Sequence, residues 1–225
     1  MGTHLPVDLQ IDVVSDIVCP WCYIGKRQLD LAIAQWQQEN PGRRAPELHW
    51  RPFQLNPDMP AEGIPRSVYL ERKFGAADGG RRFDPVRAAA RAVGLELRLD
   101  AIKVQPNTLK LHGLVELADG YDKQTALAEA FFRAYFMEGR DLSDDETLRE
   151  IAAGAGLDEG MIDAALTAES VTRLVAAADA ELREMGVTGV PLFIIGSDSG
   201  ERQAVSGAQG ADALLDAMRQ VQAAS

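Results

Sequence analysis

The sequence predicts an α/β fold in which strands near the two ends of the chain enclose a long helical segment. Three observations lead to this prediction. Apolar and polar residues alternate over positions 7–13, and a short apolar run returns at positions 191–195; both patterns are typical of strands. Between positions 64 and 185 the apolar spacing is helical instead. The only two cysteines form a Cys-Pro-Trp-Cys stretch directly after the first predicted strand.

The N-terminal unit is predicted to be strand, helix, strand. Its first strand, over positions 7–13, alternates in a way that predicts one buried face. Apolar residues at helical spacing follow, up to Trp36, and Asn40-Pro41-Gly42 ends that helix. A second strand is expected over residues 47–55, where Pro52 interrupts the alternation.

Glycine, proline and capping residues divide the segment that follows into separate predicted helices. The glycines at positions 75, 79 and 80 predict a turn. The expected helices are 64–74, 84–93, one opened by Pro106-Asn107-Thr108, one capped by Asp122, one behind a capping box at 143–146, 158–166 and 170–185.

The C-terminal unit is predicted to be strand, strand, helix, with strands over 191–195 and 203–205 and a turn over 196–200 between them. The whole order matches a thioredoxin-like fold with a large helical insertion domain. We therefore expect residues 1–57 and 186–225 to form the two parts of the thioredoxin-like domain, and residues 58–185 to form the insertion.

Composition narrows the class of function. The chain has 225 residues and is 46% hydrophobic, enough for a well-buried core. Its formal net charge is −11, so nucleic acid and anionic lipid are not expected partners. No apolar run is long enough to span a membrane, and the first ten residues lack the pattern of a secretory signal. As printed, the sequence predicts a cytoplasmic protein.

The position of the cysteine pair favours redox chemistry. Cys19 falls at the predicted N-cap of the first helix, and Pro20 takes the first helical position, where its missing N–H costs nothing. The helix N-terminus favours a thiolate. We therefore predict that Cys19 is the activated thiol and that Cys22, one turn further along, is its less exposed resolving partner.

Three other uses of a cysteine pair stay open from spacing alone. A structural zinc site needs about four ligands, and the three histidines stand at no recognisable finger spacing, so no metal is expected. A purely structural disulfide would close a very short loop and gain little entropy. Inert buried cysteines are common in cores.

Five motifs in order along the chain resemble the DsbA family of thiol–disulfide oxidoreductases, in particular its FrnE-like branch. They cover nearly the whole sequence, so the resemblance does not depend on the cysteine pair alone. They are Ser15-Asp16-(x2)-Cys19-Pro20-Trp21-Cys22-Tyr23-Ile24-Gly25, Phe53-Gln54-Leu55-Asn56-Pro57, Pro106-Asn107-Thr108-(x3)-His112, Gly189-Val190-Pro191 and Val205-Ser206-Gly207-Ala208-Gln209.

The resemblance implies a protein disulfide oxidoreductase, with isomerase activity as a variant, in which Cys19, Cys22 and a cis Pro191 are catalytic. It implies protein or small-molecule thiols and disulfides as partners, a monomer or homodimer, and no cofactor beyond the redox-active Cys19–Cys22 disulfide, with glutathione as a candidate co-substrate. The implied substrate-binding residues are Pro20, Trp21, Val190, Asn107, His112 and Gln209.

The sequence departs from this family in its proton handling. Many thioredoxin-fold oxidoreductases carry a buried acid six residues before the first cysteine, and here that residue is Val13. Asp16 and His112 are the titratable candidates to replace it. A turn-forming role for Asp16 and a structural role for His112 stay open beside this one. Lys26 and Arg27 are expected on a solvated helix face.

Two other functions compete with disulfide exchange. The first is a glutathione-dependent transferase or isomerase that resembles the kappa-class transferases and the 2-hydroxychromene-2-carboxylate isomerases. Those relatives use one Ser or Cys at the position of Cys19 and do not need Cys22, so the intact pair favours redox exchange. The second is a chaperone-like peptide-binding module in which the cysteines only sense redox state.

Overall fold

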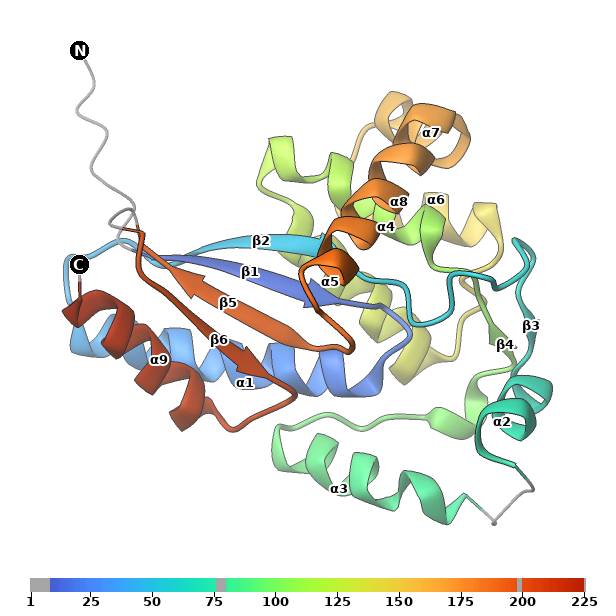
Figure 1. Cartoon of the computed structure of the whole chain (residues 1–225). Helices are drawn as coiled ribbons and strands as arrows, with labels where there is room; N and C mark the ends of the chain where they lie inside the picture. Colours follow the sequence, from blue (N-terminus) through green and yellow to red (C-terminus); the bar gives the residue numbers. More distant parts are fainter. Residues whose placement is uncertain (1–8, 76–79, 198–199, 225) are drawn as a thin grey trace.

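A computed structural model describes residues 9–75, 80–197 and 200–224 of the chain. Its main sheet has four strands in the order β2-β1-β5-β6 (Figure 1). β1 pairs with β2 in parallel and with β5 antiparallel, and β6 pairs antiparallel with β5. The order of elements confirms the predicted α/β, thioredoxin-like arrangement. The strands are β1 (Gln10–Ser15), β2 (Glu47–Pro52), β5 (Leu192–Gly196) and β6 (Arg202–Ser206).

Helices cover both faces of this sheet. α1 (Pro20–Glu39) and α9 (Ala211–Ala223) pack side by side on one face (Figure 1), where Ile11 and Val13 are buried. On the other face Val14 is also fully buried, in a cluster with Phe53 and Leu182. Over the predicted residues the alternation is confirmed, since Ile11 and Val13 are buried, Gln10 is exposed and Asp12 is half-buried; beyond them, at Val14, the second face is buried too. The cause is the helical segment, which returns over the sheet and excludes water from its second face.

The middle of the chain is helical, and most of the predicted helices are present. The first begins two residues later than predicted, because Ile64–Pro65 forms a short strand, β3, paired with β4 (Val104–Gln105). Part of the predicted glycine turn, residues 76–79, lies outside the described residues. The helices are α2 (Arg66–Phe74), α3 (Asp84–Ala92), α4 (Leu109–Leu117), α5 (Gln124–Arg133) with a π-helical turn after it (Ala134–Glu138), α6 (Asp145–Gly154), α7 (Glu159–Thr167) and α8 (Glu169–Glu184).

Two of the predicted helix caps are wrong. Asp122 has a left-handed backbone (φ 55°) at the end of a 3-10 turn, and Lys123 is the N-cap of α5 instead. At α6 the N-cap is Asp144, one residue later than the predicted box, and its carboxylate accepts a hydrogen bond from the Thr147 amide at 2.8 Å. In both places a local turn displaces the helix start by a residue or two, which propensity alone does not resolve.

The helical segment shares its core with the sheet. Tyr23 of α1 stacks on Phe132 of α5 with ring centroids 5.0 Å apart, and Trp50 of β2 lies 6.1 Å from the same ring. The Trp50 amide donates to Gln124 at 2.8 Å, so α5 also satisfies the free edge of β2. The first turn of α1 consequently lies between the sheet and the helical segment. Among the described residues, the helices lack the length and apolar character needed to cross a bilayer.

Candidate active site

The cysteine pair occupies the start of α1, as the sequence predicts. Cys19 is the N-cap residue with extended backbone, and Pro20 is the first helical residue. The Cys19 amide donates to the carbonyl oxygen of Asp16 at 3.0 Å, and the Cys22 amide donates to that of Cys19 at 3.0 Å. Both thiols are free in this structure. The tight turn therefore holds two sulfurs on the first turn of one helix, the arrangement that disulfide closure needs.

The peptide bond between Val190 and Pro191 faces this pair. It is cis, as the family resemblance implied, and the Cys19 thiol points at the Val190 carbonyl oxygen with an Sγ–O distance of 3.8 Å. Gly25 permits the close approach of α1 and β5, because a Cβ at this position would lie 3.1 Å from both the Pro191 ring and the Phe193 ring. The fold thus brings together two motifs from opposite ends of the sequence.

The two thiols have different surroundings. Cys19 is 5% exposed and Cys22 is 2% exposed, while Trp21 between them is 37% exposed. The pKa of Cys19 is lowered chiefly by a hydrogen bond from the Cys22 thiol, and also by backbone amides of the helix start, against opposing effects of burial and of Asp16. Burial raises the pKa of Cys22 well above its ordinary value. The thiolate therefore forms first at Cys19.

Asp16 and His112 meet beneath the cysteine turn. Asp16 has no exposed surface, His112 is 5% exposed, and His112 Nε2 lies 3.4 Å from Asp16 Oδ1. The other carboxylate oxygen of Asp16 accepts a hydrogen bond from the Leu55 amide at 2.8 Å. The two predicted candidates for proton handling are therefore close to one another, and Asp16 also contacts Cys19 and Cys22 through its backbone.

Ser15 is a site residue that the sequence analysis did not single out. It is the last residue of β1, it is buried, and its hydroxyl lowers the pKa of Cys22. Among the described residues its Oγ has no hydrogen-bond partner. Its position directly before Asp16 in the first motif was the only available signal, because a serine at the end of a strand is otherwise ordinary.

The remaining predicted substrate-binding residues are spread more widely. Pro20, Trp21 and Val190 surround Cys19. Asn107 instead joins two loops, since its amide donates to the Met59 carbonyl oxygen at 2.6 Å and its Oδ1 accepts from the Leu109 amide at 2.9 Å. Gln209 is exposed after β6, and its hydrogen bonds remain within its own turn.

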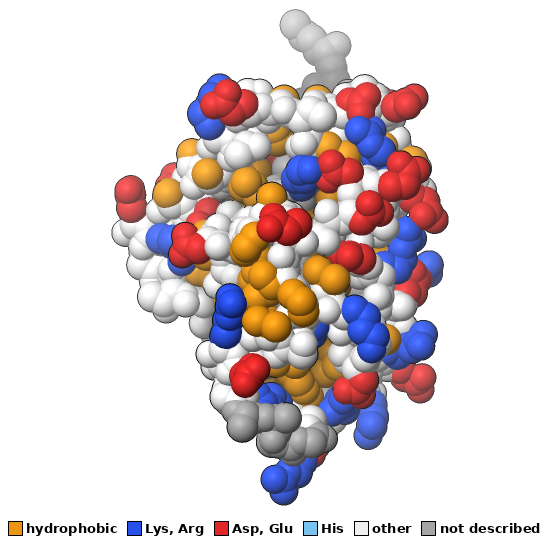
Figure 2. Space-filling model, turned by 90° about the vertical axis from the view of Figure 1, so that its right-hand side faces the viewer, with side chains coloured by type: hydrophobic (Ala, Val, Ile, Leu, Met, Phe, Trp, Pro, Cys, Tyr) orange, Lys and Arg blue, Asp and Glu red, His pale blue; other side chains and the backbone are white. Residues whose placement is uncertain are grey.

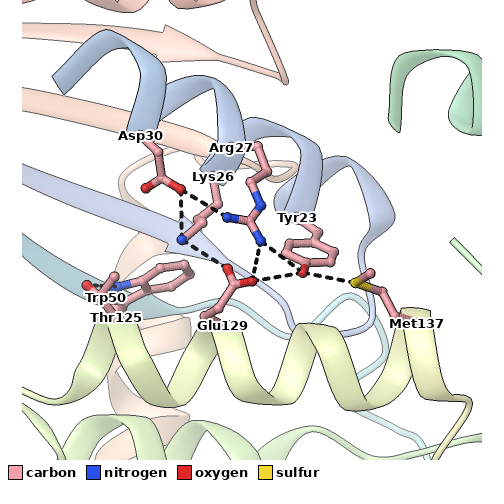
Figure 3. A network of polar contacts seen from close by, with 8 residues as sticks. All are labelled: Tyr23, Lys26, Arg27, Asp30, Trp50, Thr125, Glu129 and Met137. Atoms are coloured by element: carbon pink, nitrogen blue, oxygen red, sulfur yellow. Dashed lines mark hydrogen bonds and ion pairs between the residues drawn. The ribbon is translucent and has the colours of Figure 1, made fainter. Parts of the chain in front are cut away.

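Lys26 does not lie on a solvated face, so that prediction is wrong. It is 7% exposed and pairs with Asp30 at 2.8 Å and with Glu129 of α5 at 2.9 Å. Arg27 lies beside it and contacts Glu129 at 2.6 Å, and the Tyr23 hydroxyl donates to Glu129 at 2.9 Å (Figure 3). This network could not be predicted from local sequence because Glu129 belongs to a distant helix, α5.

The sheet and the segments that carry Cys19, Cys22 and the cis proline lie within the match to a known family. The chain belongs to the family described as the DSBA-like thioredoxin domain, whose model matches residues 10–219. This membership supports oxidoreductase activity as its general class of function. A curated relative is the uncharacterized protein YwbO of Bacillus subtilis (strain 168), 28% identical over 214 residues, which span 93% of this chain and 96% of that protein.

Solved structures with the same fold cover nearly the whole chain. A probable DsbA oxidoreductase from Streptomyces coelicolor is 33% identical, with a TM-score of 0.83 over 96% of this chain and 91% of that one. The cytosolic disulfide reductase DsbM from Pseudomonas aeruginosa, solved with GSH, is 18% identical, with a TM-score of 0.61 over 95% of this chain and 96% of that one. At that identity the second likeness concerns the fold alone.

Proposed function

We propose that this protein exchanges disulfides with protein or small-molecule thiols through the Cys19–Cys22 pair. The observation that carries the proposal is the asymmetry of the pair. Cys19 has a lowered pKa and faces the Val190 carbonyl oxygen at 3.8 Å, whereas Cys22 is more deeply buried and has a raised pKa. A nucleophilic thiol and a protonated resolving thiol are what two-step exchange requires.

The reductive reaction runs in two substitutions. The Cys19 thiolate attacks one sulfur of a substrate disulfide, forms a mixed disulfide, and releases the first substrate thiolate. Cys22 then loses its proton and attacks Cys19 Sγ, which forms the intramolecular disulfide and releases the second substrate thiolate. Two electrons pass from the protein to the substrate, and the reverse sequence oxidises a substrate dithiol.

The surroundings of Cys19 suit an extended or apolar substrate. The backbone of Val190, which lies beside the Cys19 thiol, can offer hydrogen bonds of the kind that an extended peptide uses. Leu55 lies both in the apolar cluster with Val190 and in a pocket lined further by Met59, Ile64 and Tyr69. On the face that carries α2 and β3, apolar side chains gather at the centre and charged ones surround them (Figure 2).

Several finer features belong to the same proposal. The redox-active disulfide serves as the only redox group, glutathione is the candidate co-substrate, and the protein acts in the cytoplasm as a monomer or homodimer of the FrnE-like branch. The fold likeness to a reductase solved with GSH supports the choice of co-substrate. A glutathione transferase or isomerase is the alternative, but it would leave Cys22 without a role.

Insulin reduction with dithiothreitol or glutathione as the electron source tests the proposal. Cys19→Ser should abolish turnover, and Cys22→Ser should retain attack but accumulate mixed disulfides visible by mass spectrometry. Turnover that persists in a variant carrying both Cys19→Ser and Cys22→Ser would refute redox exchange and favour the peptide-binding module. Glutathione-dependent activity that needs Cys19 but is unaffected by Cys22→Ser would favour the transferase or isomerase.

A further inference from the structure

We propose that Asp16 and His112 form a buried pair that accepts the proton of Cys22 when the mixed disulfide is resolved, while the Ser15 hydroxyl donates a hydrogen bond to the thiolate that remains. This inference rests on the proposed disulfide exchange and adds to it the residues that carry the proton.

The first argument is the unusual state of the pair. Asp16 and His112 are almost completely buried, and their facing atoms, Oδ1 and Nε2, are 3.4 Å apart. Over the described part of the chain, neither atom has a hydrogen bond of normal geometry. Burial of a polar atom without such a bond is energetically costly. A pair that only supported the fold would be expected to close this gap, whereas a gain or loss of a proton changes which atom donates.

The second argument is contact with the sulfur. The Asp16 amide and the Ser15 hydroxyl both favour the thiolate form of Cys22. The same Asp16 side chain faces His112, and its negative charge also acts on Cys19. One residue therefore contacts the cysteine turn by its backbone and His112 by its carboxylate, which links the pair to the thiol that must lose a proton.

The third argument is that Cys22 needs a nearby base to remove its proton. Cys22 is 2% exposed and its pKa lies well above the ordinary value, so water removes its proton slowly near neutral pH. Lys26, one turn further along α1, is already paired with Asp30 and Glu129. In the described part of the chain, other titratable or charged groups with a hydrogen bond or an electrostatic contact in this region include Cys19 of α1, Arg66 of α2, Glu116 of α4, Tyr135 after α5 and Asp179 of α8.

None of these neighbours is as well placed to accept the proton. Burial raises the pKa of Tyr135, so its phenol stays protonated, and the Arg66 guanidinium is a donor that binds Gln105. Asp179 accepts from the Gln54 amide at 2.9 Å and pairs with Arg183. Glu116 is half-buried on α4, and its electrostatic neighbours are Arg51, Asp119 and His112.

The proton and electron balance of the step is complete. Cys22 gives its proton to the Asp16–His112 pair, and its electron pair forms the bond to Cys19 Sγ. The bond between Cys19 and the substrate breaks, and the substrate leaves as a thiolate. The pair then returns its proton to the leaving thiolate or to solvent. The oxidant is the substrate disulfide, as in the proposed function.

The two steps can be timed separately with a chromogenic disulfide, 5,5′-dithiobis(2-nitrobenzoate). Reduced protein mixed with an excess of this reagent in stopped flow undergoes Cys19 attack, which releases the first coloured thiolate, and Cys22 resolution, which releases the second. The variants are His112→Gln, Asp16→Asn and Ser15→Ala. Asp16→Asn retains an oxygen for the Leu55 amide. The matched controls are His49→Gln, a half-exposed histidine of β2, and Asp179→Asn, a buried carboxylate that accepts from the neighbouring Gln54 amide.

We expect His112→Gln to slow the second release about 10²-fold near neutral pH, the lower end of general-base effects. The first release should be nearly unchanged, and the deficit should shrink as pH rises because hydroxide then deprotonates Cys22. For Asp16→Asn, the ratio of the rate of the second thiolate release to that of the first should fall. Ser15→Ala should slow the second release by a smaller factor. The controls should match the wild type.

Equal slowing of both releases, or a deficit independent of pH, would overturn the proposal and assign the pair a structural role. An unchanged second release would overturn it as well. If His112→Gln fails to fold by circular dichroism, the rate ratio and pH profile of Asp16→Asn decide by the same criteria. Failure of the proposed function itself would give a different result. The wild type would then form a mixed disulfide at Cys19 but release no second thiolate from it.

Discussion

The buried polar side chains around the first turn of α1 and those in its second turn differ in how closely they are paired. In the second turn, Lys26 and Arg27 find the carboxylate of Glu129, with distances of 2.9 and 2.6 Å (Figure 3). Around the first turn, Ser15 Oγ and the facing atoms of Asp16 and His112 lack normal hydrogen bonds within the described residues.

This difference separates structural from chemical roles along one helix. The Glu129 network is closed by ion pairs at 2.6 and 2.9 Å and by the Tyr23 hydroxyl, and it fixes α1 against α5. The facing atoms of Asp16 and His112 are 3.4 Å apart, so they can gain a hydrogen bond when a proton moves. We therefore expect changes in the second turn to alter stability with little effect on thiol chemistry, and changes around the first turn to do the reverse. The predictions below test this separation.

The largest expected effect on stability is that of Glu129→Gln. This change leaves the charge of Lys26, which is 7% exposed, without its interhelical partner. The loss should be about 2–3 kcal/mol of unfolding free energy, between the values for exposed and fully buried pairs. Urea unfolding measures it.

A double-mutant cycle with Lys26→Met should show coupling between the two sites. Glu169→Gln, which breaks an exposed pair with Arg173, is the matched control and should change stability little. A change in the ratio of the two thiol-release rates larger than the change in stability would contradict the assignment of this network to structure.

Gly25→Ala acts where the two regions meet. The added methyl would press on the Pro191 and Phe193 rings at 3.1 Å, and the buried Phe193 ring has little room to move. Overpacking should outweigh the helix propensity of alanine and cost about 1–2 kcal/mol, with slower thiol release. Thermal unfolding and stopped flow measure the two effects. Gly154→Ala, where a Cβ meets nothing within 4 Å, should be neutral or stabilising.

Tyr23→Phe removes the hydroxyl that donates to Glu129 at 2.9 Å but keeps the stack on Phe132. The pKa of Tyr23 is raised to about 12, chiefly by burial, so this hydroxyl stays protonated and donates throughout the neutral range. A loss of about 1 kcal/mol is expected in urea unfolding. Thiol kinetics that change while stability does not would argue against the separation.

The smallest effect is the pH dependence of the reduced protein. Because the pKa of Cys19 is lower in the folded state, unfolded chains bind more protons there, and stability should rise with pH up to the ordinary thiol value of about 8.5. The raised pKa of Cys22 has the opposite sign, so stability should fall above that value. Urea unfolding of Cys19→Ser should lack the rising part, and a rise that persists would refute its assignment to Cys19.

Asp16→Asn should lower the pKa of Cys19 further, since the charge of Asp16 raises it. Thiolate absorbance against pH, measured in the Cys22→Ser background, detects the shift. An unchanged or higher pKa would show that Asp16 does not act on the first turn of α1 through its charge.

Local sequence was enough to predict the order of the main-sheet strands and of the helices and the position of the cysteine pair, but not the short β3–β4 pair. Pro20 and the periodic apolar residues after it specify where α1 begins, because capping and periodicity are properties of adjacent residues. The cis bond at Pro191 was available only through the family resemblance, since most X-Pro bonds are trans. The cap predicted at Asp122 was wrong, and the cap of α6 was placed at position 143, one residue before Asp144, because competing turns differ by small energies.

Contacts between distant residues decided the rest. The sequence alone determined that Cys19 begins a helix and that the chain carries Asp16 and His112, but only the packing of α4 beneath the end of β1 brings those two side chains within 3.4 Å. In the same way, local sequence predicts that Lys26 is a surface charge, and only the packing of α5 against α1 places Glu129 beside it. The physical reason is that local propensity acts over a few residues, whereas burial and ion pairing depend on which elements the hydrophobic core draws together.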